Sequence, residues 1–149
     1  MKKNITILLS LAILAFLGLA FTTNHDVEKD EVSGIQFFQG TWEEALAKAK
    51  AENKLVFIDA YAAWCGPCKI LSKKYFTNEA VGTFYNTNFI NYKMDMEKHA
   101  QGPRLARKFS LKAYPTLYFL NPDESIVHTS LGLINDKQLI EVGKAAISK

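Results

Sequence analysis

Cysteine is scarce in this sequence, and its scarcity limits what the two cysteines can do. The 149-residue chain contains only Cys65 and Cys68, three positions apart. Small secreted proteins that depend on disulfides for their stability carry several cysteines spread along the chain. A pair this close cannot join distant segments, and closing so short a loop removes little entropy from the unfolded chain. The pair is therefore expected to be chemical rather than structural.

A strong charge of one sign is also missing. The chain has 18 Lys and Arg residues against 15 Asp and Glu residues, and 16 against 15 once Lys2 and Lys3 are set aside. Proteins that bind nucleic-acid phosphates carry a marked excess of basic residues, so no nucleic-acid partner is expected. Internal repeats and low-complexity segments are absent as well, whereas the 48% hydrophobic content is enough to bury one sizeable core.

One long apolar run is present, and it lies at the start of the chain. Two lysines precede apolar residues 5–21, and Gly18 and Ala20 are small residues near its end. This order is typical of a secretory signal peptide over residues 1–21, and cleavage is predicted after Ala20, which leaves Phe21 as the first residue of the mature chain. The run is also close to the shortest that spans a bilayer, about 17 residues, which leaves an uncleaved N-terminal anchor as the alternative. No cysteine follows the run, which disfavours a lipid-modified N-terminus. The domain is expected outside the cytoplasm, in the periplasm.

The rest of the chain divides into a linker and one domain. Residues 22–34 are polar and charged, which predicts a linker, and a single domain is expected over residues 35–149. Thr41 and Glu44 have the spacing of a capping box, which predicts a helix that ends near Glu52.

Helices and strands alternate along the domain and a hairpin closes it. The patterns predict strands over residues 55–58, 89–94, 116–120 and 125–131, and helices over about 66–75, from Asn78, over about 102–109 and from Asn135. In the last helix an apolar stripe is expected, made of Leu139, Val142, Ala146 and Ile147. This order predicts an α/β fold with a mixed β-sheet between layers of helices.

The two cysteines lie where the first strand gives way to a helix. A thiol must ionise before it can attack a disulfide, and its ordinary pKa of about 8.5 leaves only a few per cent as thiolate near neutral pH. The partial positive charge of a helix N-terminus stabilises that anion. Cys65 is expected at this junction, with Cys68 one turn into the helix and shielded. Pro67 suits the first turn because its missing N–H would have no helical partner.

A metal site is the main alternative for two cysteines in this spacing. Zinc would usually need a second pair of Cys or His ligands, and His25, His99 and His128 are isolated from one another in the sequence. His25 lies in the linker, and the other two are expected to be solvated surface residues. No metal and no other cofactor is predicted.

Two motifs resemble those of thioredoxins. The segment Trp64-Cys65-Gly66-Pro67-Cys68-Lys69 resembles their active-site motif, and Tyr114-Pro115-Thr116 resembles the later motif that carries their cis proline. The resemblance covers about residues 35–149 and implies the thioredoxin fold and a lowered pKa of Cys65, for which thioredoxin itself is the standard example. Residues 75–81 look more like exported thioredoxin-like domains, including the C-terminal domain of transmembrane thiol:disulfide interchange reductases.

The resemblance also implies roles for two charged residues. Asp59 matches the buried aspartate that exchanges the proton of the second cysteine, and Lys93 matches the lysine that pairs with this acid. From the residues alone, Asp59 follows four apolar residues and so is expected to be buried, although a polar residue at a strand end is the alternative. For Lys93 a solvated strand residue is an equal alternative. The sequence departs from the family at Lys73, where thioredoxins usually carry a helix-kinking proline.

The remaining implied roles concern substrate binding. The resemblance places Pro115 in the cis form against the cysteines and lets the backbone of Tyr114 pair with an extended substrate segment, as in strand addition. Trp64, Gly66 and Pro67 would complete the substrate-binding surface, with Trp64 covering the site rather than filling the core.

The sequence therefore predicts a monomeric thiol:disulfide oxidoreductase that acts on protein disulfides. Reductase activity is expected, because Gly66 and Pro67 supply no charged or imidazole group that would further stabilise a thiolate. The implied electron donor is a membrane-bound thiol reductase, because a cytoplasmic reductase could not reach the site. Two alternatives remain: an oxidant or isomerase, and a module that binds unfolded chains in the groove around Trp64 and Pro115 without turnover.

Overall fold

Four strands form one mixed sheet in the computed structural model, which describes residues 33–149. The predicted signal peptide or anchor, and the linker up to residue 32, lie outside the described residues. The strands are β1 (Leu55–Tyr61), β2 (Phe89–Asp95), β3 (Thr116–Leu120) and β4 (Ile126–Leu131), in the spatial order β2-β1-β3-β4. Strand β2 runs parallel to β1, and the pairs β1–β3 and β3–β4 are antiparallel. Within the described residues, no helix combines the length and apolar character that crossing a membrane would need.

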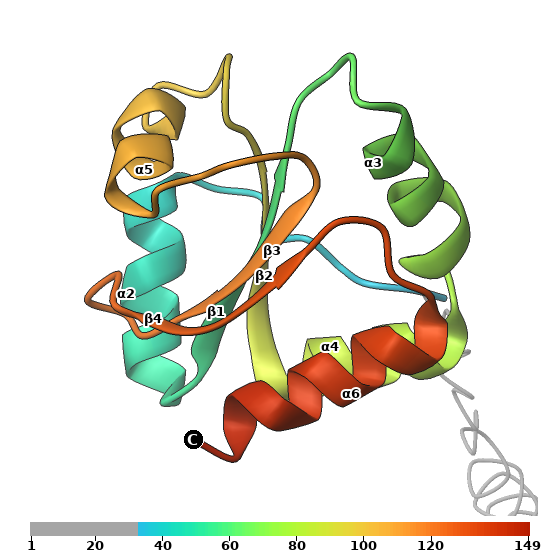
Figure 1. Ribbon diagram of the computed structural model, residues 1–149. Helices are drawn as coiled ribbons and strands as arrows, with labels where there is room; N and C mark the ends of the chain where they lie inside the picture. The colour runs from blue at the N-terminus through green and yellow to red at the C-terminus, as the bar shows by residue number, and fades with distance from the viewer. Residues whose placement is uncertain (1–32) are drawn as a thin grey trace, which may run out of the picture. The chain divides into compact units, whose positions relative to one another are not determined.

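Two layers of helices cover the sheet. Figure 1 shows α2 (Trp42–Glu52) and α5 (Gly102–Lys108) on one side, and α3 (Gly66–Ile70), α4 (Glu79–Asn88) and α6 (Asp136–Ile147) on the other. The N-termini follow from local sequence. Capping boxes open α2 and α6, and Asn78 caps α4. The prediction of an α/β fold with a mixed sheet between helices is confirmed, with Ser125 lying just outside β4.

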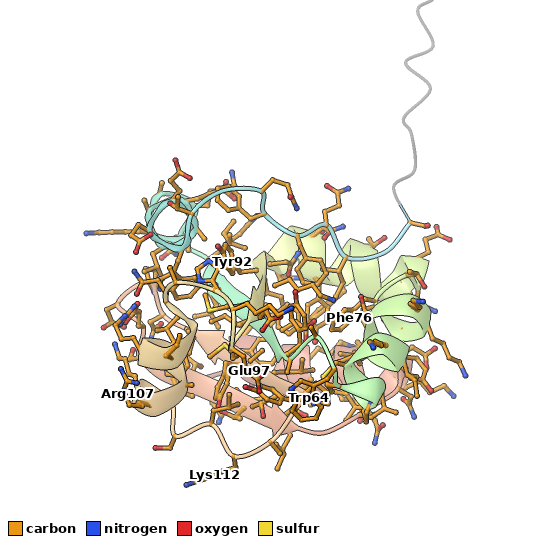
Figure 2. The ribbon with its side chains drawn as sticks, turned by 90° about the horizontal axis from the view of Figure 1, so that it is seen from above. Trp64, Phe76, Tyr92, Glu97, Arg107 and Lys112 are labelled. Atoms are coloured by element: carbon orange, nitrogen blue, oxygen red, sulfur yellow. A yellow bond between two sulfur atoms is a disulfide. The ribbon has the colours of Figure 1, made fainter. Side chains whose placement is uncertain are left out.

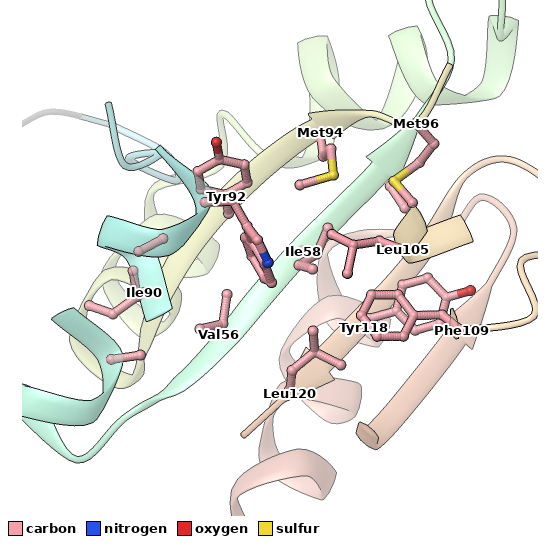
Figure 3. Packing of buried hydrophobic residues seen from close by; sticks show 14 residues of the cluster. Val56, Ile58, Ile90, Tyr92, Met94, Met96, Leu105, Phe109, Tyr118 and Leu120 are labelled. Atoms are coloured by element: carbon pink, nitrogen blue, oxygen red, sulfur yellow. The ribbon is translucent and has the colours of Figure 1, made fainter. Parts of the chain in front are cut away.

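Each face of the sheet has its own hydrophobic core because side chains alternate along a strand. Val56 and Ile58 of β1 point toward α2 and α5, into the cluster that Figure 3 shows. Phe57 points the other way and joins an aromatic cluster with Tyr85 and Phe119. Asp59 is two residues after Phe57, so it faces the same side.

The helix after the cysteines changes its winding. Helix α3 runs into a single π-helical turn, η1 (Leu71–Tyr75), in which the Phe76 N–H donates to the Leu71 carbonyl. Lys73 lies in this turn, so the helix departs from regular geometry without a proline.

The stripe predicted on the last helix is correct only in part. Leu139 and Ala146 are fully buried and Val142 packs beside them, but Ile147 is 48% exposed. It is the final residue of α6.

Candidate active site

The two cysteines form a disulfide at the start of α3. Their sulfur atoms are 2.08 Å apart. Cys65 is the N-cap residue of the helix, and its sulfur accepts a hydrogen bond of 3.1 Å from the Cys68 N–H. Pro67 lies in the first turn, where no helical donor is lost. The Cys65 sulfur thus occupies the place where a helix N-terminus stabilises negative charge.

Burial does not distinguish the two cysteines in this oxidised state. Cys65 is 2% exposed and Cys68 is 4% exposed, so the shielding expected for Cys68 applies to both. Their positions on the helix differ instead, because only Cys65 caps its N-terminus. That difference favours ionisation of Cys65 over Cys68 after reduction.

Trp64 precedes the first cysteine and does not belong to the core. Its side chain is 68% exposed, and its ring meets that of Tyr114 edge-on with 5.8 Å between centroids. The indole N–H donates to Glu97 Oε2 at 3.0 Å, and Figure 2 shows the two residues together. Sequence analysis missed Glu97. Its only signal was the acidic turn after β2, where Asp95 accepts from the Glu97 N–H.

The loop before β3 lies against the disulfide. The Tyr114–Pro115 bond is cis, as the family resemblance implied, and Tyr114 packs against Ala62 and the cysteines. The Pro115 carbonyl accepts a hydrogen bond of 2.8 Å from the Gly132 N–H. Leu131, which precedes Gly132, is 60% exposed and pairs with Thr116 across the strands. An apolar side chain that sequence analysis missed is therefore exposed on this side of the molecule.

Asp59 is a fully buried acid with a single cationic partner. It is 0% exposed, and neither carboxylate oxygen accepts a hydrogen bond within the described residues. Lys93, its direct partner on β2, places Nζ 3.2 Å from Oδ2. Burial raises the pKa of Asp59 above its usual value, and the charge of Lys93 opposes the rise only in part. The predicted burial and the predicted pairing are both present.

A small cavity joins the region of Lys93 to the second cysteine. Its volume is about 160 Å³, and it is lined by Cys68, Ser72, Lys93 and Tyr61 among others. Sequence analysis missed Ser72, which gives no signal beyond its position four residues after Cys68. The cavity is large enough for water and gives solvent a route to Cys68.

The histidines stand apart from this site. His99 is half-buried, where Nδ1 accepts from the Gln101 N–H and Nε2 lies 3.2 Å from the Tyr92 hydroxyl. His128 is half-buried too, with its ring near that of Phe119. The expectation of solvated surface residues is therefore wrong for both. Over residues 33–149, no three His, Cys, Asp or Glu side chains are grouped as metal ligands would be. His25 lies outside the described residues.

Comparisons with known proteins agree with this geometry. The sequence matches the thioredoxin family over residues 34–144. It is 33% identical over 82 residues to the chloroplastic thioredoxin-like protein CITRX of rice, Oryza sativa, a match that covers 55% of this chain and 40% of the relative. The chain therefore spans about two fifths of the length of the curated relatives that it matches first.

Solved structures extend the likeness. A candidate disulphide isomerase from Bacteroides thetaiotaomicron is 37% identical with a TM-score of 0.70, and the match covers 79% of this chain and 97% of that one. The oxidised C-terminal domain of DsbD from Neisseria meningitidis is 22% identical with a TM-score of 0.57, over 71% of this chain and 95% of that one. The second likeness is one of fold alone.

Proposed function

The chain belongs to the thioredoxin family, whose members are thiol-disulfide oxidoreductases, and we propose that it reduces protein disulfides outside the cytoplasm. The observation that carries this proposal is the Cys65–Cys68 disulfide at a helix N-terminus, with the Cys68 N–H directed at the Cys65 sulfur. The site needs no metal or cofactor for this exchange, because the two sulfurs themselves carry the electrons.

The reaction begins from the reduced pair. The Cys65 thiolate attacks one sulfur of a substrate disulfide, a mixed disulfide forms, and the other substrate sulfur leaves as a thiolate that takes up a proton. Cys68 then gives its proton to Asp59 and attacks the Cys65 sulfur. The Cys65–Cys68 disulfide forms as the second substrate thiolate leaves, so two electrons pass from the protein to the substrate.

The surface beside the cysteines suits an extended, partly apolar substrate. Gly66 and Pro67 are exposed, and nothing lies within 4 Å of where a Gly66 side chain would begin. Trp64 and Leu131 add exposed apolar area. The Tyr114 backbone could extend a substrate segment by strand addition. This arrangement supports a protein substrate whose disulfide must come close to Cys65.

The direction of electron flow follows from what surrounds the Cys65 sulfur. Stabilising the thiolate makes the disulfide more oxidising, by roughly 30 mV for each pKa unit. The exposed Gly66 and Pro67 contribute no charged donor, so the helix N-terminus acts nearly alone. This favours a reductase, which outside the cytoplasm needs a donor such as a membrane-bound thiol reductase. We expect the mature chain to begin at Phe21, and N-terminal sequencing of the exported protein tests that expectation.

Isomerase activity is the second candidate function, because the Bacteroides relative is described in those terms. Equilibration of the protein against glutathione buffers, with the redox state of both cysteines measured by alkylation, distinguishes a reductase from an isomerase. A reductase requires a strongly reducing buffer to open the disulfide, whereas an isomerase opens in milder ones. Reduction of insulin tests turnover itself. Peptide binding without insulin reduction would instead support a binding module.

A further inference from the structure

The Lys93 ammonium is held by more than its carboxylate partner. Nζ lies 3.2 Å from Asp59 Oδ2 and donates a hydrogen bond of 2.7 Å to Ser72 Oγ. Three aromatic ring centroids lie 4.9, 5.6 and 5.9 Å from the same nitrogen, in Tyr61, Phe37 and Phe76. Such contacts attract a cation, so the ammonium has a defined position between β1 and η1.

Ser72 connects this ammonium to the cysteine side of the site. It lies in η1, four residues after Cys68, and residues at this spacing lie on one side of a helix. Ser72, Lys93 and Cys68 all line the cavity of about 160 Å³. The serine hydroxyl is thus the one uncharged hydrogen-bond partner of the Lys93 ammonium within the described residues.

We propose that Ser72 is a positioning residue for proton transfer from Cys68 to Asp59. This inference rests on the proposed thiol–disulfide exchange. By accepting a hydrogen bond from Lys93, the hydroxyl keeps the ammonium beside the carboxylate, which favours the ionised acid. The proton then leaves the Cys68 sulfur for a carboxylate oxygen of Asp59. The Cys68 thiolate bonds to the Cys65 sulfur, and the substrate sulfur leaves with the electron pair of the broken bond.

The position of the ammonium matters because Asp59 has little else to stabilise its charge. Burial raises the pKa of Asp59, and Lys93 is the group that opposes the rise. The Lys93 side chain is 28% exposed, so without Ser72 it has room to turn toward solvent. Asp59 would then stay protonated at a higher pH and could not accept the proton of Cys68.

Other charged groups near the cluster do not replace Lys93. The titratable and charged groups around it are Asp59 and Tyr61 on β1, Cys68 and Lys69 on α3, Lys73 on η1, and Lys93 and Asp95 on β2. Burial, with the charges of Asp95 and Asp59, raises the pKa of Tyr61, so its hydroxyl remains neutral. Lys69 and Lys73 are exposed, so water screens their charges.

The test uses the reduced full chain and two substitutions of the serine. Ser72→Ala removes the hydroxyl, Ser72→Thr keeps it, and Ser148→Ala makes the same chemical change at the end of α6. The pKa of Asp59 is read by NMR titration of its carboxyl carbon. The rate at which a preformed mixed disulfide resolves is followed from pH 5 to pH 9.

We expect Ser72→Ala to raise the pKa of Asp59 and to slow resolution about threefold to tenfold at neutral pH, which corresponds to half a pKa unit to one unit. The rates should converge with the wild type at high pH, where Asp59 is ionised in both. Ser72→Thr and Ser148→Ala should follow the wild type. In a Lys93→Met background Ser72→Ala should change nothing further, because the serine acts through the lysine.

A rate that falls by the same factor at every pH, or an unchanged pKa of Asp59 in Ser72→Ala, would overturn the proposal. So would an equal effect of Ser72→Ala with and without Lys93. The NMR titration needs no substrate, so it decides the role of Ser72 even if insulin reduction fails. Failure of the proposed function is therefore distinguishable from failure of this inference.

Discussion

Two acidic residues on opposite sides of the sheet, Glu124 and Asp59, each have a lysine partner, yet their pKa values are shifted in opposite directions. Glu124, in the turn between β3 and β4, lies 2.7 Å from Lys108 Nζ and accepts hydrogen bonds of 2.9 and 2.7 Å from Arg104. The buried Trp42 indole donates a further bond of 2.7 Å. Hydrogen bonding by Arg104 is the main cause that lowers the pKa of Glu124, to about 2.

Asp59 has one cation and no such set of donors. Its oxygens are completely buried and accept no hydrogen bond within the described residues, so burial prevails and its pKa rises. The comparison shows that a nearby lysine does not by itself set the direction in which the pKa of an acid shifts. The direction depends on how many hydrogen-bond donors reach the carboxylate, weighed against how strongly burial disfavours its charge. Glu124, with its lowered pKa, joins α2 and α5 to a turn as an anion, whereas Asp59, with its raised pKa, is the acid that we propose exchanges a proton.

The largest expected effect tests whether Cys65 and Cys68 have separate roles, as the proposed service of Asp59 to Cys68 requires. With Cys68→Ser the mixed disulfide has no resolving thiol, so substrates should accumulate covalently on Cys65 and turnover should stop. Cys65→Ser should trap almost nothing. Non-reducing gels of each variant incubated with oxidised protein substrates measure the difference. Equal trapping by both variants would mean that the two cysteines do not have separate roles.

Removal of each acid should separate activity from stability. We expect Asp59→Ala to slow insulin reduction at neutral pH by about a hundredfold, the lower range of what a positioned proton acceptor contributes. The free energy of unfolding should not fall, because an incompletely paired buried acid contributes little to stability. Stopped-flow assays and urea denaturation measure the two quantities. A rate equal to the wild type across the pH range would show that Asp59 takes no part.

Glu124→Ala should give the converse result. The change leaves the buried Trp42 N–H without its acceptor, and an unpaired buried donor costs about 2 kcal/mol. Insulin reduction below the unfolding temperature should be unchanged. Glu124 also has a positive φ of 67°, so Glu124→Gly relieves the backbone while removing the same side chain. Glycine should therefore be less destabilising than alanine, and urea denaturation of both variants measures the contrast. Slower insulin reduction by either Glu124 variant would contradict the expectation that Glu124 affects stability and not activity.

The smallest expected effect is in the pH dependence of stability, where the two acids should have opposite signs. The folded-state pKa of Glu124 is about 2, below its unfolded value of 4.5, so its stabilisation is present above pH 4.5 and is lost as the pH falls toward 2. The pKa of Asp59 is raised, so its ionisation weakens the fold as the pH rises above its unfolded value of 3.8.

Urea titrations between pH 2 and pH 8 measure this contrast. Protonation of Glu124 should lower the free energy of unfolding by only about 1 kcal/mol, because solvent screens the half-exposed Arg104 and Lys108. Glu124→Gln should flatten the acid side of the curve, and Asp59→Asn should remove the decline above pH 3.8. A Glu124→Gln curve that still falls with the wild-type slope between pH 4.5 and pH 2 would assign the acid sensitivity to other carboxylates.

The elements that local sequence controls were predictable. The capping boxes of Thr41 with Glu44 and of Asn135 with Gln138 place helix N-termini where the structure has them. Cys65 was placed at the start of a helix by different reasoning, from its position after the first predicted strand and from Pro67 in the first turn. Ile147 shows the limit of such local reasoning. The apolar pattern of the helix continues to the end of α6, but the hydrophobic core does not reach that far, so Ile147 is exposed.

The sequence by itself thus determined the helices, the strands and the position of the cysteine pair, with the family motifs indicating Asp59, Lys93 and the cis proline. The partners that surround these groups were decided only by tertiary structure. Glu97 reaches Trp64 from 33 positions away, Ser72 reaches Lys93 across 21, and Glu124 meets Trp42 across 82. Such contacts depend on strand register and on which helix face meets the sheet. Both follow from packing of the whole core, and no local pattern encodes them.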